Sequence, residues 1–184
     1  MSPTSIKNPK NQSISYGSSG INSVTNLLGE LVKYHTNKNL IHVPYKGANL
    51  AIPDLISGDL DSSFFFYNTV NSHMNNHDFN VIATTQKLPE HPNIPTFNQL
   101  GIKELNDYPV WMVVFSNRTE NQSELNNIRT ILINSLSDPD IRQRFKSAGI
   151  SISQKTELLP DGFLVFERKR YQTLLKQINI SASN

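Results

Sequence analysis

The sequence predicts an α/β fold with a mainly parallel sheet. Short apolar or alternating segments recur along the chain, amphipathic segments of helical spacing lie between them, and small or turn-forming residues separate the two kinds. Strands and helices that alternate in this way are typical of βαβ units, whose strands run parallel. The 184 residues are enough for one domain with a substantial core, or for one domain and a fraction of another.

The first strand and the first helix are joined by small residues. Residues 13–16 alternate between polar and apolar, which predicts a short strand, and Gly17–Gly20 form a tight turn. Apolar residues then recur every three or four positions, which predicts a helix over 21–35. The hydroxyl of Ser18 or Ser19 can cap this helix.

The next segment repeats the pattern. Residues 40–43 form an apolar strand that Pro44 ends, and a loop over 45–48 follows. The helix after this loop ends at Gly58. It is expected to start late, because Pro53 cannot donate a backbone hydrogen bond inside a helix.

The remaining elements are expected on the same criteria. Asp138 is a cap with proline at the first helical position after it, and the strand over 110–115 is apolar on both faces and hence buried. The expected strands cover 61–66, 79–84, 110–115 and 150–153, the expected helices cover 122–136, 139–149 and 161–178, and two shorter segments are a loop or short helix over 68–74 and a Thr96-capped helix that ends at Gly101.

Composition excludes several classes of function. The absence of Cys excludes disulfides, cysteine nucleophiles and thiolate-bound zinc or iron–sulfur clusters. Seventeen basic residues against 15 acidic ones are close to balance, so charge favours neither a nucleic acid nor a membrane surface as a partner. No apolar run approaches the ~20 residues that span a bilayer, and residues 1–12 lack the apolar region of a signal peptide.

The Gly17–Gly20 turn is the first candidate site. Its backbone N–H groups, its serine hydroxyls and the dipole of the following helix favour an anion. We expect Gly17 to adopt a positive φ, so that Gly17→Val abolishes binding. A plain capped turn is the alternative, since the segment is neither a P-loop nor a dinucleotide fingerprint.

Two weaker candidates follow. Tyr45–Ala48 is another strand-to-helix turn, with a phenol and the cation of Lys46, although such a lysine is more often a solvated surface residue. His73 and His77 have helical spacing but no acidic third ligand nearby, so we expect no metal site there. His42 is expected to pack within its strand or bind a backbone group.

Several motifs occur in a specific order from about residue 5 to the end. They are YGSSG at 16–20, LGEL at 28–31, HVPYKG at 42–47, DLISGDLD at 54–61, IPT at 94–96, Gly101, Trp111, SDPDIR at 137–142 and AG at 148–149. In this order and spacing they resemble the substrate-binding proteins of tripartite tricarboxylate transporters, also called the Bug family.

The resemblance implies a type II periplasmic-binding-protein fold, the Venus flytrap, in which two lobes close on a small carboxylate. Family members are longer, so the match is expected to begin partway through their pattern. Residues 13–108 are then a nearly complete lobe two, which is the ligand-binding α/β lobe. Residues 109–184 are the returning C-terminal segment of lobe one, and residues 1–12 are a lead-in.

The resemblance also implies site residues. Tyr16, Gly17, Ser18, Ser19 and Gly20 would hold a carboxylate, and Tyr45, Lys46, Gly47 and Ala48 would line the same cleft. Phe65 stands where members usually have an acidic residue, which makes that wall more apolar. No catalytic residue, metal or cofactor is implied.

The implied partners are the carboxylate and a membrane permease that receives it. The implied location is the periplasm, although a chain without a signal peptide stays cytoplasmic if expressed as written. An N-terminal lobe or self-association would cover the apolar faces of the helices over 122–136 and 161–178.

Two other functions stay open. The chain can be a non-binding remnant or split-gene product that needs an N-terminal partner. The more remote alternative is a small α/β hydrolase with Ser18 or Ser19 as nucleophile. The nucleophile-elbow motif is absent, however, and no His–Asp pair is evident.

Overall fold

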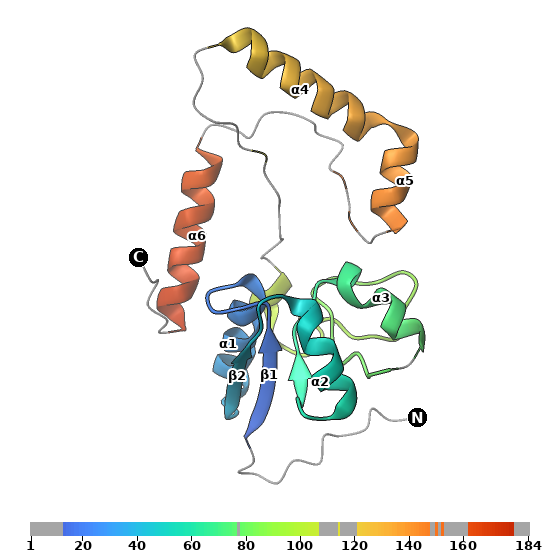
Figure 1. The fold of residues 1–184 in the computed structure, drawn as a ribbon. Coiled ribbons are helices and arrows are strands. Elements are labelled where there is room, and N and C mark those ends of the chain that lie inside the picture. The colour runs from blue at the N-terminus through green and yellow to red at the C-terminus, as the bar shows by residue number, and fades with distance from the viewer. Residues whose placement is uncertain are drawn as a thin grey trace. The chain divides into compact units, whose positions relative to one another are not determined.

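The computed structural model describes residues 13–76, 78–106, 114, 121–147, 150, 152 and 162–178. The chain divides into two compact units, Met1–Val110 and Trp111–Asn184, and each is described by itself. Figure 1 shows the elements of both. The assignment of the two units to lobes stays a prediction. The strands expected over 110–115 and 150–153 fall on residues of which only 114, 150 and 152 are described, so they lie outside the described part.

Unit one is built on a parallel sheet of three strands in the order β2-β1-β3. The strands are β1 (Ile14–Ser18), β2 (Leu40–Pro44) and β3 (Ser62–Ser63). Both neighbours of β1 run parallel to it, which confirms the prediction of an α/β fold with a parallel sheet. The carboxyl ends of β1 and β2 therefore meet at one edge, since Ser18 is paired with Pro44.

Side chains attach the very short β3 to β1. The Asp61 carboxylate accepts hydrogen bonds from the backbone N–H and the hydroxyl of Ser15, at 2.8 and 2.7 Å. The Ser63 hydroxyl donates to the Gly17 carbonyl at 3.1 Å. The strand predicted over 61–66 was too long, because the chain leaves the sheet after Ser63.

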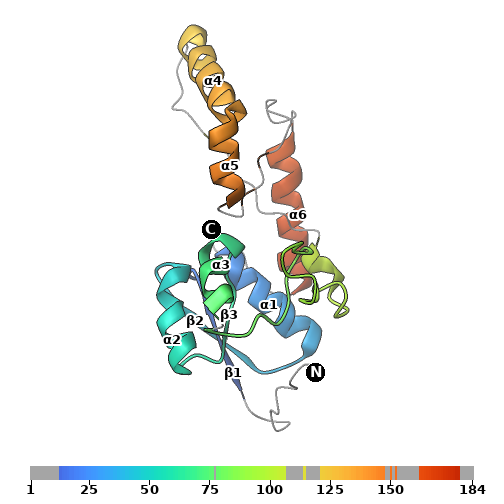
Figure 2. The ribbon, with the colours of Figure 1, turned by 90° about the vertical axis from the view of Figure 1, so that its right-hand side faces the viewer.

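Helices lie on both faces of this sheet. Figure 2 shows α1 (Val24–Thr36) and α2 (Ile52–Ser57) on opposite sides of the strands. Successive residues of a strand point to opposite faces, and the neighbours of Tyr16 and Gly17 agree: Tyr16 packs against α1, whereas Gly17 faces Ala51 at the start of α2.

The helix α1 begins three residues later than predicted. Ser23 caps it, because its hydroxyl accepts a hydrogen bond from the Asn26 N–H at 3.1 Å. The predicted caps Ser18 and Ser19 are therefore wrong. Ile21, counted as the first apolar helical position, lies before the helix and is 72% exposed.

The segment after β2 is close to the expectation. A 3-10 turn η1 (Ala48–Ala51) leads into α2, with Pro53 in the first turn, where its missing N–H costs no helical bond. Gly58 ends the helix with φ +85°, a conformation that glycine adopts without strain.

The second half of unit one differs most from the prediction. The helix α3 (Tyr67–Asn76) and a 3-10 turn η2 (Lys103–Asn106) are present. The strand predicted over 79–84 is absent, and only a single bridge joins Thr84 to Thr96. Phe79 and Val81 instead pack against the core cluster of Ile52, Val70 and Met74.

Unit two contains the described helices α4 (Gln122–Ser137), α5 (Pro139–Ser147) and α6 (Phe163–Gln177). Their predicted positions are confirmed to within a few residues. Asp138 caps α5 as expected, because its carboxylate accepts the N–H groups of residues 140 and 141 at 2.9 and 3.1 Å. No helix in the described part of the chain is both long and apolar enough to span a membrane.

Candidate functional site

The turn after β1 starts later than the sequence indicates. Gly17 and Ser18 belong to the strand, so the connection to α1 is Ser19–Ser23. The expectation that Gly17 has a positive φ is wrong. A β-carbon on Gly17 would lie 2.8 Å from Leu60 Cδ2 and from Ser63 Oγ, so close packing, and not backbone conformation, requires glycine there.

Gly20 is the glycine of this turn that needs conformational freedom. Its φ is +131°, a region that L side chains rarely adopt. A β-carbon there would lie 3.5 Å from the Tyr45 carbonyl oxygen. The turn after β1 therefore lies directly against the turn after β2.

Hydrogen bonds inside the first turn occupy several groups that were expected to face a ligand. The Ser19 N–H donates to the Thr25 hydroxyl at 2.9 Å, and the Ser19 and Thr25 hydroxyls are 2.9 Å apart. The Gly20 N–H donates to the Ser18 hydroxyl at 3.1 Å. The turn is thus held in shape by its own hydroxyls.

The start of α1 is the part of this turn best suited to an anion. The first N–H groups of a helix have no acceptor within the helix, and the helix dipole is positive at that end. The Ser23 hydroxyl accepts a hydrogen bond from the third of these groups, the Asn26 N–H, and itself donates to the Gly20 carbonyl at 2.7 Å. The N–H groups of Val24 and Thr25 are the two that precede it in the first turn.

The second turn is joined to the first by a backbone hydrogen bond. The Tyr45 N–H donates to the Ser18 carbonyl at 3.1 Å. We call residues 18–23 together with residues 45–48 the turn junction. The structure thus brings together the predicted site residues Ser18, Ser19 and Gly20 with those of the second turn.

The Tyr45 phenol is committed within the protein. Its hydroxyl donates to the Asp54 carboxylate at 2.6 Å, and this bond, followed by desolvation, raises the pKa of Tyr45 to about 12. Lys46, the next residue, is exposed. Of the two polar side chains, the ammonium is therefore the one available to a solute in water.

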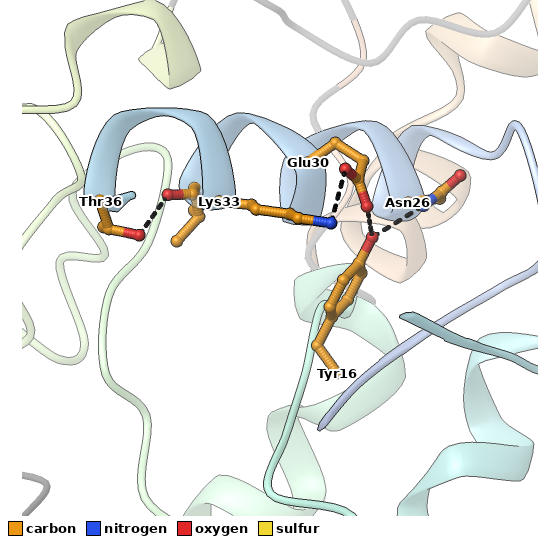
Figure 3. Close-up of polar contacts among 6 residues, drawn as sticks. Tyr16, Asn26, Glu30, Lys33 and Thr36 are labelled. Atoms are coloured by element: carbon orange, nitrogen blue, oxygen red, sulfur yellow. Dashed lines mark hydrogen bonds and ion pairs between the residues drawn. The ribbon is translucent and has the colours of Figure 1, made fainter. Parts of the chain in front are cut away.

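Tyr16 packs against α1 and does not line the surface of the first turn. The ring is fully buried, its hydroxyl donates to Glu30 at 2.6 Å and accepts from the Asn26 amide at 2.9 Å, as Figure 3 shows. Desolvation, with the Glu30 hydrogen bond second, raises the pKa of Tyr16. Gly29 lets the ring approach α1, since a β-carbon there would collide with it.

His42 packs within its strand, as the sequence indicates, but its polar partner is a side chain and not the expected backbone group. Its Nε2 lies 2.6 Å from the Ser18 hydroxyl, and its ring stacks on Tyr16 with centroids 5.0 Å apart. Burial lowers the pKa of His42 below 6.5, with a smaller opposing effect from Glu30. The signal that could have found this pair is the parallel alignment of YGS with HVP, but the register is not readable from either motif alone.

Phe65 lies away from the turn junction's hydrogen bonds. Its ring stacks on Phe79 with centroids 6.2 Å apart and packs against the core cluster of α2 and α3. The neighbouring Phe64 instead meets the Tyr16 ring edge-on. The role of Phe65 as a site residue stays a prediction.

Among the described residues, no group of three or more acidic or histidine side chains could hold a metal ion. His73 bonds to Asp78 at 2.8 Å, and its expected partner His77 lies outside the described residues.

Comparison with known proteins matches residues 4–180 to the family described as "Tripartite tricarboxylate transporter family receptor". A curated relative from Pseudomonas sp. (strain P51), a UPF0065 protein in the tcbD-tcbE intergenic region, is 23% identical over 173 residues. That match covers 92% of this chain and 51% of the relative. The chain therefore spans about half the length of this curated relative.

Three solved structures share the fold. The periplasmic binding protein BugD has a TM-score of 0.74 at 20% identity, with 92% of this chain and 58% of that chain covered. Rpa4515 of R. palustris, solved with adipate, has a TM-score of 0.73 at 20% identity and coverage of 94% and 58%. MatC of Rhodopseudomonas palustris, solved with malate, has a TM-score of 0.69 at 17% identity and coverage of 90% and 56%. The α/β fold is thus that of part of a periplasmic binding protein.

Proposed function

The chain belongs to the tripartite tricarboxylate transporter receptor family, and on that premise we propose that it binds a small carboxylate at the turn junction. Receptors of this family are transporter substrate-binding proteins and not enzymes. In the proposed function the bound carboxylate passes to a membrane permease, and the protein works in the periplasm. Relatives solved with adipate and with malate support a carboxylate as the class of ligand.

The observation that carries this proposal is the contact between the two turns. The Tyr45 N–H to Ser18 carbonyl bond of 3.1 Å, with Gly20 next to the Tyr45 carbonyl, places the first turn beside the second turn. Ligands of open α/β sheets bind at the carboxyl ends of strands. In the proposal a carboxylate there interacts with the N-terminus of α1 and with the exposed Lys46.

We assign the predicted residues different parts within this site. Gly20 and the following helix start face the ligand, together with Lys46, Gly47 and Ala48. Tyr16, Gly17 and the Ser18 side chain support the turn, because Tyr16 and Ser18 are fully buried and Gly17 is packed against Leu60. Residues 13–108 act as the ligand-binding lobe and residues 109–184 as the returning segment of the other.

Isothermal titration of the 184-residue chain against adipate, malate and a panel of other di- and tricarboxylates tests the proposal. We expect saturable heat with at least one of them. High salt should lower the affinity, because the interaction is between charges. Monocarboxylic fatty acids of the same length serve as the control panel. If no carboxylate gives heat, this chain is not a working receptor.

In a second candidate function, the chain binds its ligand only in complex with an N-terminal partner. The observation that favours it is an exposed apolar stripe on α4, where Ile128 and Ile131 are 46% and 55% exposed. Contiguous apolar surface of this kind often marks an interface. Sedimentation of the chain alone, and with the N-terminal half of a longer family member, shows whether the two polypeptides associate. Carboxylate binding that appears only in the mixture supports the second candidate.

The structure argues against Ser18 as the nucleophile of a hydrolase. It places a histidine beside Ser18, which the sequence did not indicate. The Ser18 side chain is nevertheless fully buried, so its hydroxyl cannot reach a substrate.

A further inference from the structure

We infer that His42 is a positioning residue of the turn junction: its imidazole sets the direction of the Ser18 hydroxyl that closes the first turn onto Gly20. His42 contacts neither the proposed carboxylate nor the helix start directly. It acts through Ser18. The effect on ligand binding rests on the proposed function, whereas the effect on the turn does not.

The Ser18 hydroxyl has three polar neighbours and one proton. It lies 2.6 Å from His42 Nε2, 3.0 Å from the Gly20 carbonyl oxygen and 3.1 Å from the Gly20 nitrogen. The Gly20 N–H can only donate to it. The hydroxyl proton therefore goes either to His42 or to the Gly20 carbonyl, and the protonation of Nε2 decides which.

We place the proton of the neutral ring on Nδ1, so that Nε2 is the atom that titrates; the two protonation states then reverse this chain of hydrogen bonds without moving its heavy atoms. When Nε2 carries a lone pair, Ser18 donates to His42. When Nε2 carries a proton, it donates to Ser18, and Ser18 donates to the Gly20 carbonyl. That carbonyl also accepts from the Ser23 hydroxyl at 2.7 Å, so the change reaches the cap of α1.

The surroundings of His42 make it a suitable group for this role. Tyr16 of β1 holds the imidazole by stacking, and the Tyr16 hydroxyl is fixed by Glu30 of α1. Glu30 also pairs with Lys33 at 3.8 Å. The ring is therefore held against Ser18, and Glu30 is the carboxylate that faces it from the neighbouring helix.

The sign of the effect follows from charge. A protonated imidazole adds a positive charge behind a turn that faces an anion. Carboxylate affinity is therefore expected to rise several-fold as the pH falls through the pKa of His42.

Nuclear magnetic resonance of the full 184-residue chain tests the turn without any ligand. Between pH 5 and pH 8, approximately the range in which histidine titrates, we expect the Gly20 amide signal to shift with the same midpoint as the His42 ring. In Ser18→Ala the ring still titrates, but the Gly20 amide no longer follows. A Gly20 amide that stays constant while the His42 ring titrates overturns the inference.

Two substitutions of His42 separate positioning from packing. His42→Gln keeps a hydrogen-bonding group but does not titrate, and His42→Phe keeps the stack on Tyr16 but has no nitrogen. We expect the pH-dependent shift of Gly20 to be lost in both and to persist in the matched control His91→Gln. Persistence of the shift in His42→Gln contradicts the inference.

The binding arm uses malate. The ratio of wild-type to His42→Gln affinity cancels the titration of malate itself, and we expect this ratio to increase several-fold from pH 7.5 to pH 5.5. A constant ratio contradicts the effect on binding. If no carboxylate of the panel binds to wild type or to any of the variants, the proposed function fails, while the Gly20 titration still decides the role of His42.

Discussion

The Tyr45 N–H donates a hydrogen bond of 3.1 Å to the Ser18 carbonyl and so joins the turns that follow two adjacent parallel strands. The bond joins Ser18, which is paired with Pro44 in the sheet, to the residue that follows Pro44. It extends the sheet register into the loops. The spacing of the two turns is therefore set by backbone geometry. Substitutions in the residues packed against the turns should alter the site.

Gly29→Ala tests the packing beneath the first turn. Alanine favours a helix over glycine by ~1 kcal/mol, so propensity alone predicts stabilisation. The new β-carbon collides with the buried Tyr16 ring, and overpacking costs about 1–3 kcal/mol. We expect a net lower unfolding free energy in urea, and restoration when Tyr16→Leu is added. A more stable Gly29→Ala variant contradicts the packing described.

Tyr45→Phe tests the bond that commits the phenol to Asp54. The folded pKa of Tyr45 is raised from 10.0 to about 12, so the bond stabilises the fold fully below pH 10 and is lost as the pH rises through 12. We expect the unfolding free energy of the wild type to fall more steeply than that of Tyr45→Phe over this range. Tyr34→Phe, at an exposed tyrosine of α1, is the control and should retain the steep fall.

His42→Gln tests the burial of the imidazole through acid stability. The folded pKa of His42 is lowered below 6.5, so the unfolded chain binds more protons than the folded one between the two pKa values. The stabilisation is present above pH 6.5 and is lost as the pH falls through the folded pKa. We expect this acid-side loss in thermal unfolding to be smaller in His42→Gln and unchanged in His91→Gln. Identical pH profiles of wild type and His42→Gln count against a buried imidazole.

The sequence predicted the parallel sheet and the two turns because both depend on local patterns. Apolar alternation, small residues after a strand and a proline at the end of β2 are visible in a single sequence. The consequence that two such turns lie together follows from parallel strands alone. The helices of unit two were predicted for the same reason, since capping by Asp138 is a local signal.

The features that the sequence did not predict depend on the register of the strands and on which of several similar residues fills a given role. Four serines lie between residues 15 and 23, and only the structure shows that Ser23 caps α1 while Ser18 turns toward His42. The sequence suggests that backbone conformation requires glycine at position 17, but the requirement comes from the close packing of Leu60 from another segment. The three phenylalanines after β3 resemble a strand, yet Phe65 leaves the sheet to join the core cluster.

The most direct measurement is carboxylate titration of two matched glycine variants. Gly20 and Gly101 both have a positive φ, +131° and +90°, so alanine strains either turn, and only Gly20 belongs to the turn junction. Strain of this kind costs of order 1 kcal/mol. We expect Gly20→Ala to weaken binding of the carboxylate at least about tenfold and Gly101→Ala to leave it unchanged. Equal affinity of Gly20→Ala and wild type would contradict a carboxylate site at the turn junction.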